Sequence, residues 1–227
     1  MVKHLEVERR QHKEQLYKLF TQIASAMANA HRLELLDLLA QAPRTVEELA
    51  EQAGMSVANT SQHLQRLKQA RLVVADREGV SMRYRLADPI VARLWLQLRA
   101  AAEQQLAEVE RALDAYRNRR HEFEAISAAE LEARLRQNDA VLLDVRPTVE
   151  YEAGHLPGAI SIPWYEVEQR LDELPPDKDV VAYCRGPYCV YADDVLAILR
   201  EHGRNAFRLE EGVVEWQQKG LVLAQAG

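Results

Sequence analysis

The chain has 227 residues, of which 48% are hydrophobic and 28% charged, and its formal net charge is −6. That length allows one large domain or two small ones, each with an apolar core. No stretch approaches the roughly eighteen apolar residues of a membrane span, and the first residues are charged rather than apolar. We therefore expect a cytoplasmic protein with no membrane segment.

The net charge hides a difference between the two halves of the chain. Residues 1–120 hold nineteen Lys and Arg against fifteen Asp and Glu, a net charge of +4, whereas the remainder holds ten against twenty, a net charge of −10. A mildly basic half attached to an acidic half is compatible with nucleic-acid binding by the first half alone. The asymmetry also predicts two domains, which we place at 1–120 and 121–227.

The first half is predicted to be mainly helical. Apolar residues at three- and four-residue intervals predict a helix over residues 5–40, which Pro43 ends. Thr45 begins a capping-box pattern and predicts a short helix to about residue 53, and Ser56 is expected to cap another helix to about residue 70. Residues 72–75 and 82–86 then predict a β-hairpin with a polar tip. A long helix is expected over 88–120, and its narrow apolar seam suits pairing with a second copy or packing against another helix of the same chain.

Two short helices followed by a hairpin is the order of a winged helix-turn-helix, in which the second helix reads DNA. The helix after Ser56 is rich in groups that contact base edges or phosphates, and the hairpin adds cations. In this helix Val57, Leu64 and Leu67 are expected to face the core. The candidate DNA-binding residues are Asn59, Thr60, Ser61, Gln62, His63, Gln65, Arg66, Lys68, Arg77 and Arg83.

Residues 16–100 resemble the ArsR/SmtB family of bacterial repressors. The resemblance is carried by residues 30–36, 47–50 and 56–67 and by the hairpin. It implies a homodimer held by the first and last helices of the domain, with the 57–70 helix of each subunit in a major groove of an operator. Family members that sense metals carry Cys or His on the first helix of the reading motif or on the last helix. This chain has no thiol around Val46–Glu48 and no His between Asp88 and His121, so we predict no metal site and no cofactor.

The second half alternates strands and helices, which predicts an α/β domain with a mainly parallel sheet. The expected strands are 141–145, 159–162, 180–183 and 206–209, and a capping pattern at Ser127 predicts a helix to about residue 136. Asp144 and Arg146 are expected to form a structural ion pair or to cap the loop.

Both cysteines of the chain lie in one loop that follows the strand 180–183 and precedes a helical pattern from Tyr191. A thiol at such a turn faces backbone N–H groups and a helix N-terminus, which favour the reactive thiolate. We expect Arg185 to add positive charge at the mouth, Gly186 to allow an unusual backbone angle, and the loop to hold the two sulfurs too far apart for a direct disulfide without rearrangement. The candidate catalytic residues are Cys184, Arg185, Gly186, Tyr188 and Cys189.

Residues 123–223 resemble the rhodanese family of sulfurtransferases. The resemblance is carried by residues 142–146 and 150–159, the loop at Cys184, and Glu211-Gly212 with Trp216. It implies that Cys184 accepts a sulfane sulfur as a persulfide from a donor such as thiosulfate or polysulfide. The related phosphatases need an arginine six positions after the cysteine, and here that position is Val190, so phosphoryl chemistry is not expected.

Two questions stay open at the level of the sequence. Cys189 either joins Cys184 in a disulfide or polysulfide bridge or packs as an inert apolar group. The chain is a repressor whose DNA affinity responds to sulfur or oxidants through the 88–120 helix, or a sulfurtransferase whose helical half recruits or dimerises. A third alternative is a plain DNA-binding repressor with an inactive rhodanese fold.

Overall fold

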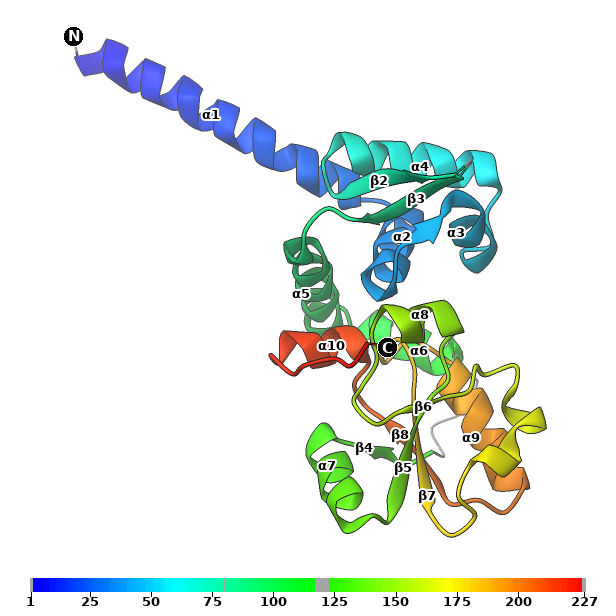
Figure 1. The fold of residues 1–227 in the computed structure, drawn as a ribbon. Coiled ribbons are helices and arrows are strands. Elements are labelled where there is room, and N and C mark those ends of the chain that lie inside the picture. The colour runs from blue at the N-terminus through cyan, green and yellow to red at the C-terminus, as the bar shows by residue number, and fades with distance from the viewer. Residues whose placement is uncertain (1, 80, 117–122, 226–227) are drawn as a thin grey trace. The chain divides into compact units, whose positions relative to one another are not determined.

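The computed structural model describes residues 2–79, 81–116 and 123–225, and its contacts divide the chain into a unit of Met1–Leu96 and a unit of Gln97–Gly227. The boundary expected between residues 120 and 121 lies outside the described residues. The expected fold class is confirmed: one unit is helical with a small antiparallel sheet, and the other is α/β with a parallel sheet (Figure 1).

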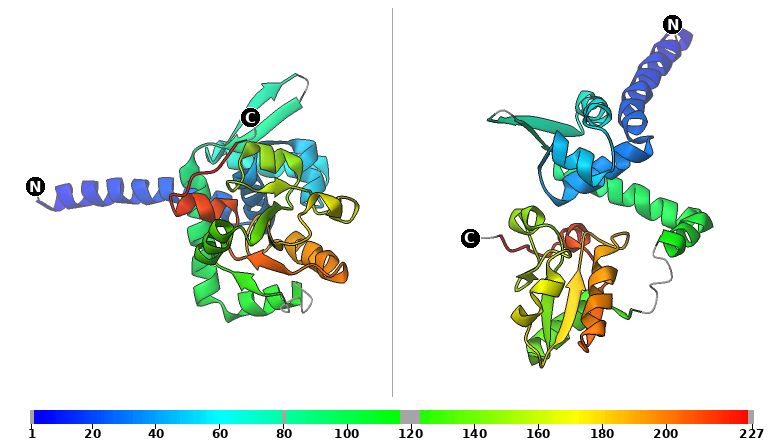
Figure 2. Two further views of the ribbon diagram at one scale, coloured as in Figure 1. Left: turned by 60° about the horizontal axis from the view of Figure 1, so that its bottom comes forward. Right: turned by 90° about the vertical axis from the view of Figure 1, so that its right-hand side faces the viewer.

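The first unit contains α1 (Val2–Met27), α2 (Ala30–Gln41), α3 (Val46–Gln52), α4 (Val57–Gln69) and the start of α5 (Pro89–Gln105). Its sheet has the order β1 (Arg44–Thr45), β3 (Ser81–Leu86), β2 (Val73–Glu78), with antiparallel pairs throughout. The core is formed by α2, α3, α4 and the hairpin, with Leu35, Leu49, Leu64 and Leu67 fully buried. In Figures 1 and 2, α1 projects from the rest of this unit.

The expectation of one helix over residues 5–40 is wrong, because the chain breaks between α1 and α2. Asn29 has extended backbone angles and accepts a hydrogen bond from the Arg32 amide at 3.2 Å, so it caps a new helix. Asn is among the best N-cap residues, and the hydrophobic periodicity on both sides concealed it. The caps expected at Thr45 and Ser56 are confirmed: Thr45 forms a full capping box with Glu48, and Ser56 accepts from the Asn59 amide.

The helix expected over 88–120 is also interrupted. α5 ends at Gln105 and α6 (Ala107–Tyr116) follows, while residues 117–120 lie outside the described residues. The Leu106 carbonyl accepts from the Val109 amide rather than continuing the ladder of α5. Part of the apolar seam of α5 packs within the chain: Val91 is buried in the core of the first unit, and the Trp95 indole donates to Asp37 at 2.8 Å.

In the second unit a five-stranded parallel sheet has the order β4 (Ala125–Ile126), β8 (Ala206–Leu209), β7 (Asp179–Tyr183), β5 (Ala140–Asp144), β6 (Ile160–Ser161). One face packs against α9 (Tyr191–Glu201) and the 3-10 turn η2 (Val167–Gln169), and a second turn, η3 (Leu171–Glu173), follows η2. The other face packs against α7 (Ala128–Gln137) and α10 (Val213–Gln218), and α8 (Thr148–Ala153) follows β5. Figure 2 shows α9, in orange, lying along one side of the sheet.

The alternation of side chains along β7 explains these layers. Val180 and Ala182 belong to the core under α9, whereas Val181 and Tyr183 belong to the core under α7 and α10. All four side chains are fully buried, as expected for a central strand of a covered parallel sheet. None of the described helices is long and apolar enough to cross a membrane.

Candidate functional site

The cysteine loop lies at the carboxyl edge of the parallel sheet, between β7 and α9. Ligand sites in open α/β sheets form at this edge, where strand ends and helix N-termini meet. Cys184 is 4% exposed and joins the core under α9, and residues 185–190 are half-buried. The loop is therefore a partly accessible turn anchored by a buried cysteine.

Cys184 and Cys189 form a disulfide, with their Cα atoms 6.1 Å apart. The expectation that the loop keeps the two sulfurs too far apart is wrong. The loop closes on itself because the Cys189 amide donates to the Gly186 carbonyl at 3.1 Å and Gly186 adopts φ +147°, a backbone angle that suits glycine. Two thiols that can bond to each other on one loop are chemically a dithiol pair.

Arg185 does not offer a free charge at the mouth of the loop. Its guanidinium donates to the Glu150 carboxylate on α8, from Nε at 2.9 Å and from Nη2 at 2.6 Å. Glu150 is fully buried and the Arg185 side chain is 12% exposed. The charge of Arg185 is therefore balanced locally, and its guanidinium also lies 5.6 Å from the centre of the Tyr191 ring.

Beneath the loop a buried polar network fixes the end of the sheet. The ion pair expected between Asp144 and Arg146 is confirmed, with Nη2 and Oδ2 2.6 Å apart and both side chains fully buried. The Tyr183 hydroxyl donates to Asp144 at 2.5 Å and accepts from the Leu156 amide. Burial and the Asp144 charge raise the pKa of Tyr183, so this phenol stays protonated. Its two hydrogen bonds fix the end of β7 immediately before Cys184.

The start of α10 packs directly on the loop. A Cβ placed on Gly212 would lie 2.3 Å from the Arg185 carbonyl oxygen, so only glycine fits there. Glu215 accepts from the Gly212 amide at 3.1 Å, and its Oε1 lies 3.0 Å from where a Cβ on Gly186 would be. The sequence interpretation missed both Glu150 and Glu215 as loop neighbours. Glu150 stood in a segment that carried the family resemblance, whereas nothing in the sequence marked Glu215.

Within the unit of Gln97–Gly227, the carboxyl end of α5 also contacts the loop and α10. The Tyr188 hydroxyl donates to Glu103, and Arg99 lies 2.5 Å from Glu215 and 3.5 Å from Glu103. The Arg99 guanidinium is 5.3 Å from the centre of the Tyr188 ring. Two residues of α5 therefore position Tyr188: Glu103 accepts from its hydroxyl, and Arg99 lies over its ring.

The expected DNA-reading residues on α4 are mostly available to solvent. Ser61 and His63 are half-buried, and Thr60 is fully buried, with its hydroxyl donating to the Ser56 carbonyl at 3.0 Å. Thr60 is therefore unable to reach a base edge. The exposed candidates are Asn59, Gln62, Gln65, Arg66 and Lys68.

Leu64 and Leu67 face the core as expected, but the same expectation for Val57 is wrong. Val57 is the first residue of α4 and its side chain is 48% exposed.

The arginines of the hairpin are paired within their own unit. Arg83 contacts Glu78 at 2.5 Å and donates to the Pro43 carbonyl, Arg77 donates to the Gly79 carbonyl, and Arg85 contacts Asp76 at 3.0 Å. Exposed ion pairs such as Arg83 with Glu78 contribute only about 0–1 kcal/mol to stability, so a DNA phosphate can replace the carboxylate. The pairing therefore leaves Arg77 and Arg83 as candidates for backbone contact.

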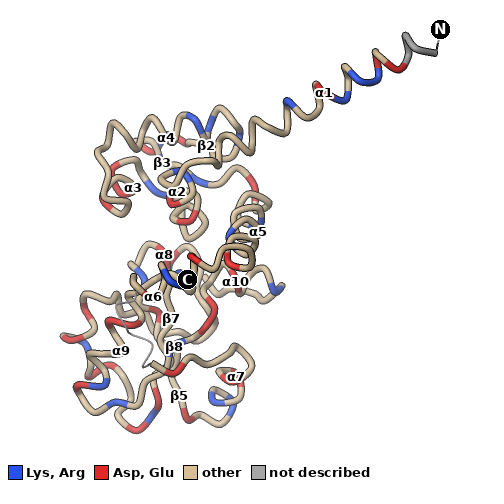
Figure 3. Tube along the Cα trace, turned by 180° about the vertical axis from the view of Figure 1, so that it is seen from behind, with Lys and Arg blue, Asp and Glu red and all other residues tan. Residues whose placement is uncertain are grey.

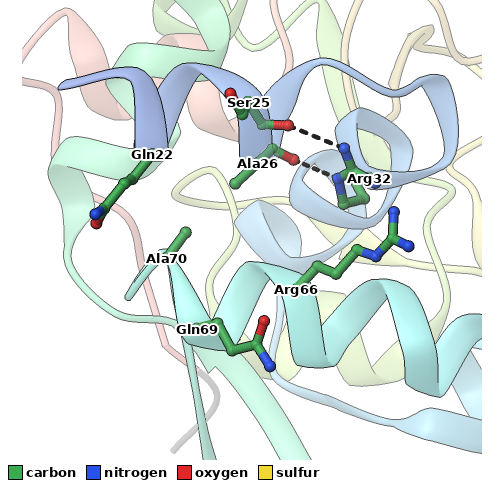
Figure 4. A pocket seen from close by; sticks show the side chains of 7 residues that line it. All are labelled: Gln22, Ser25, Ala26, Arg32, Arg66, Gln69 and Ala70. Carbon is green, nitrogen blue, oxygen red and sulfur yellow. Dashed lines mark hydrogen bonds between the residues drawn. The ribbon is translucent and has the colours of Figure 1, made fainter. Parts of the chain in front are cut away.

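A pocket of about 350 Å³ lies between the end of α1 and the carboxyl half of α4 (Figure 4). Arg32 is buried there and donates to the Ser25 and Ala26 carbonyls, which ties α2 to the end of α1. Burial and the nearby Arg66 lower the pKa of Arg32. His63 lies beside His31 with ring centres 5.5 Å apart, and its pKa is lowered by burial and by the charges of Arg32, His31 and Arg66.

In the described part of the chain, no three His, Cys, Asp or Glu side chains are grouped as ligands of a metal ion.

Comparison with known proteins gives both halves a family. The profile of the bacterial regulatory proteins of the arsR family matches residues 29–74, and that of the rhodanese-like domain matches residues 127–219. The chain is 46% identical to the HTH-type transcriptional regulator Rv0324 of Mycobacterium tuberculosis over 199 residues, which is 88% of this chain and 87% of the relative. The chain belongs to the ArsR family and carries a C-terminal rhodanese-like domain.

Two other similarities of this ArsR-family chain each cover less than half of it. The chain is 33% identical over 83 residues to a sulfurtransferase of Allochromatium vinosum, covering 37% of this chain and 77% of that protein. A solved structure of the homodimeric winged helix-turn-helix domain of Mb0332 from Mycobacterium bovis, a possible ArsR-family regulator, is 41% identical with a TM-score of 0.40. It covers 42% of this chain and 89% of that one.

Proposed function

We propose that this chain is a DNA-binding transcriptional repressor whose affinity for its operator is set by sulfur chemistry at Cys184. The observation that carries the proposal is the bonded pair Cys184–Cys189 on the loop at the edge of the rhodanese-like sheet. A dithiol that closes and opens on one loop has at least two covalent states. A sulfane sulfur gives further states, a persulfide on Cys184 or a bridge with an inserted sulfur.

DNA contact is assigned to α4 and the hairpin. The amide side chains of Asn59, Gln62 and Gln65 suit adenine edges, and Arg66 and Lys68 suit guanine or phosphate. Gln65 also donates to the Tyr84 hydroxyl at 3.1 Å, which links α4 to the hairpin. Ser61, His63, Arg77 and Arg83 complete the proposed surface, and Thr60 supports the helix from within.

The route from the loop to the reading helix is assigned to α5. Tyr188 of the loop and Glu215 beside it both contact the carboxyl end of α5, through Glu103 and Arg99. α5 is a continuous helix that begins at Pro89, and Val91 near its start belongs to the core formed with α2 and α4. A change in loop conformation that moves Tyr188 therefore acts on a helix that is part of the DNA-binding core.

A homodimer is proposed from apolar side chains left uncovered on the helices at either end of the winged helix. On α1, Leu16 and Phe20 are 53% and 64% exposed. On α5, Ile90, Leu94 and Leu98 recur every fourth residue and are 41–59% exposed. Stripes of this size are typical of helix-pairing surfaces, and Phe20→Glu should convert the dimer to a monomer in analytical ultracentrifugation.

The experiment that tests the repressor hypothesis uses DNA selected by the full-length protein from a random-sequence pool. Wild type is titrated with this DNA before and after treatment with inorganic polysulfide, and Cys184→Ser is treated identically. We expect treatment to weaken wild-type binding and to leave Cys184→Ser unchanged. Equal affinity of treated and untreated wild type would contradict the coupling.

A second candidate function is sulfurtransfer as an end in itself. The rhodanese-like profile over residues 127–219 and the 33% identity to a sulfurtransferase favour it. In that case the protein would turn over thiosulfate and cyanide steadily, and polysulfide would leave its DNA binding unaltered. The same DNA titration therefore separates the two functions when it is paired with a turnover assay.

A further inference from the structure

The charges around the cysteine loop indicate which sulfur donors it accepts. We propose, resting on the function assigned to Cys184 above, that the loop takes sulfane sulfur from organic hydropersulfides with an uncharged or cationic organic group and discriminates against thiosulfate. Glu150 and Glu215 are the residues that set this preference.

The first argument is the charge balance at the loop. Among the described residues, the arginines at the loop each face a carboxylate: Arg185 faces Glu150, and Arg99 faces Glu215 and Glu103. Arg146 beneath the loop also interacts with Glu150 and is itself paired with Asp144, so these three arginines face four carboxylates and a net negative charge remains. A thiosulfate dianion would have to displace a carboxylate from a buried, bidentate arginine pair to gain a cation of its own.

The second argument concerns the helix that follows the loop. The N-terminus of a helix attracts anions, but the first turn of α9 carries Asp193 and Asp194. Asp193 is 1% exposed and lies 3.7 Å from Arg208, which balances its charge. The half-buried Asp194 carboxylate offsets the attraction of the helix terminus for a dianion. Figure 3 shows Asp and Glu in red and Lys and Arg in blue along the trace of the second unit.

The third argument is the wall beside Arg185. The Trp164 and Tyr191 rings are stacked with centres 4.8 Å apart, and both pack against the core that includes Cys184. Both rings are half-buried. An aromatic surface next to balanced charges suits an organic group better than an oxyanion.

The reaction balances without an added reductant. The terminal sulfur of R–S–S⁻ attacks Cys184 in the disulfide, forming Cys184–S–S–S–R and releasing the Cys189 thiolate. That thiolate attacks the middle sulfur and expels R–S⁻, which takes up the proton of the original R–S–SH. The product is a Cys184–S–S–S–Cys189 bridge and one R–SH. Thiosulfate would give the same bridge and release sulfite, so the two donors can be compared by a single product.

The test follows sulfur incorporation into the full-length disulfide protein by intact mass, with cysteamine hydropersulfide or thiosulfate at equal concentration. We expect the hydropersulfide to react at least about tenfold faster, and the thiosulfate rate to rise with added salt as the carboxylates are screened. Glu215→Gln should raise the thiosulfate rate about threefold or more, since glutamine keeps the bond to the Gly212 amide and removes the charge.

Glu201→Gln is the matched control, because it removes one negative charge from an exposed residue at the far end of α9 and should change neither rate. Comparable rates for the two donors, or a Glu215→Gln effect no larger than that of Glu201→Gln, would overturn the donor preference while leaving the function of Cys184 intact. Failure of both donors to add sulfur would instead overturn the proposed function.

Discussion

Replacing Glu150 by glutamine should destabilise the second unit far more than replacing a glutamate at its surface. Glu150 is fully buried and accepts hydrogen bonds from both Nε and Nη2 of Arg185, so Glu150→Gln leaves a nearly buried guanidinium without its counter-charge. Removing one partner of a buried ion pair lowers the free energy of unfolding by about 3–5 kcal/mol. The amide oxygen of the new glutamine can keep one hydrogen bond from Arg185, so we expect a loss of about 3 kcal/mol. With a urea slope of about 2 kcal/mol/M, the midpoint should fall by about 1.5 M.

The assay is urea unfolding of the full-length protein followed by fluorescence, since Trp164 and Trp216 both lie in this unit. The matched control is Glu132→Gln, because Glu132 pairs with Arg136 at 3.6 Å on an exposed helix face and such pairs contribute about 0.5 kcal/mol or less. Equal midpoint shifts for Glu150→Gln and Glu132→Gln would refute the assignment of a buried anchor beneath the loop.

The pair can also be removed as a unit. In Glu150→Leu combined with Arg185→Met neither buried charge is left alone, so the double variant should be more stable than Glu150→Leu by about 1–3 kcal/mol. Strict additivity of the two single substitutions would show that the side chains do not depend on each other.

Three further predictions concern local features of the fold. Gly212→Ala should cost about 1–3 kcal/mol, because the new Cβ would collide with the Arg185 carbonyl 2.3 Å away, and a variant with an unchanged urea midpoint would show that α10 does not pack on the loop. Asn29→Ala should lower stability by about 1 kcal/mol through loss of the cap at the start of α2, measured as a reduced melting temperature; no change would mean that the cap is dispensable. Because the pKa of His63 is lowered in the fold, its contribution to stability is complete above the unfolded pKa of about 6.5 and is lost as the pH falls from there through the folded value. His63→Asn should flatten the dependence of the urea midpoint on pH in that acidic range, and an unaltered slope would contradict the depressed pKa.

The helix caps and the buried strands of this fold could be predicted from the sequence. Thr45 and Ser56 cap the helices they were expected to cap, and the strands around Leu143 and Val181 lie where apolar runs predicted them. These features depend on residues close together in the chain. The missed break at Asn29 is also local, but the apolar periodicity continued on both sides of it and concealed the cap.

The features that sequence reasoning could not supply depend on residues far apart in the chain. Arg185 looked like a free cation because its partner Glu150 lies 35 positions earlier. Glu215 meets the loop only because α10 returns to the edge of the sheet beside it. The closed disulfide likewise follows from the backbone path at Gly186, which spacing alone did not reveal.

The coupling between sulfur and DNA is tested most directly by measuring the affinity of one DNA for two covalent states of the same protein. Wild type is prepared as the disulfide form and as the form with one sulfur inserted between Cys184 and Cys189, and intact mass verifies each preparation. Each form is then titrated with DNA selected by the full-length chain. The proposed function predicts that the inserted sulfur weakens binding by about tenfold, a coupling of about 1.4 kcal/mol. Identical affinities of the two forms would contradict it and would leave the chain as a DNA-binding protein whose rhodanese-like domain acts on its own.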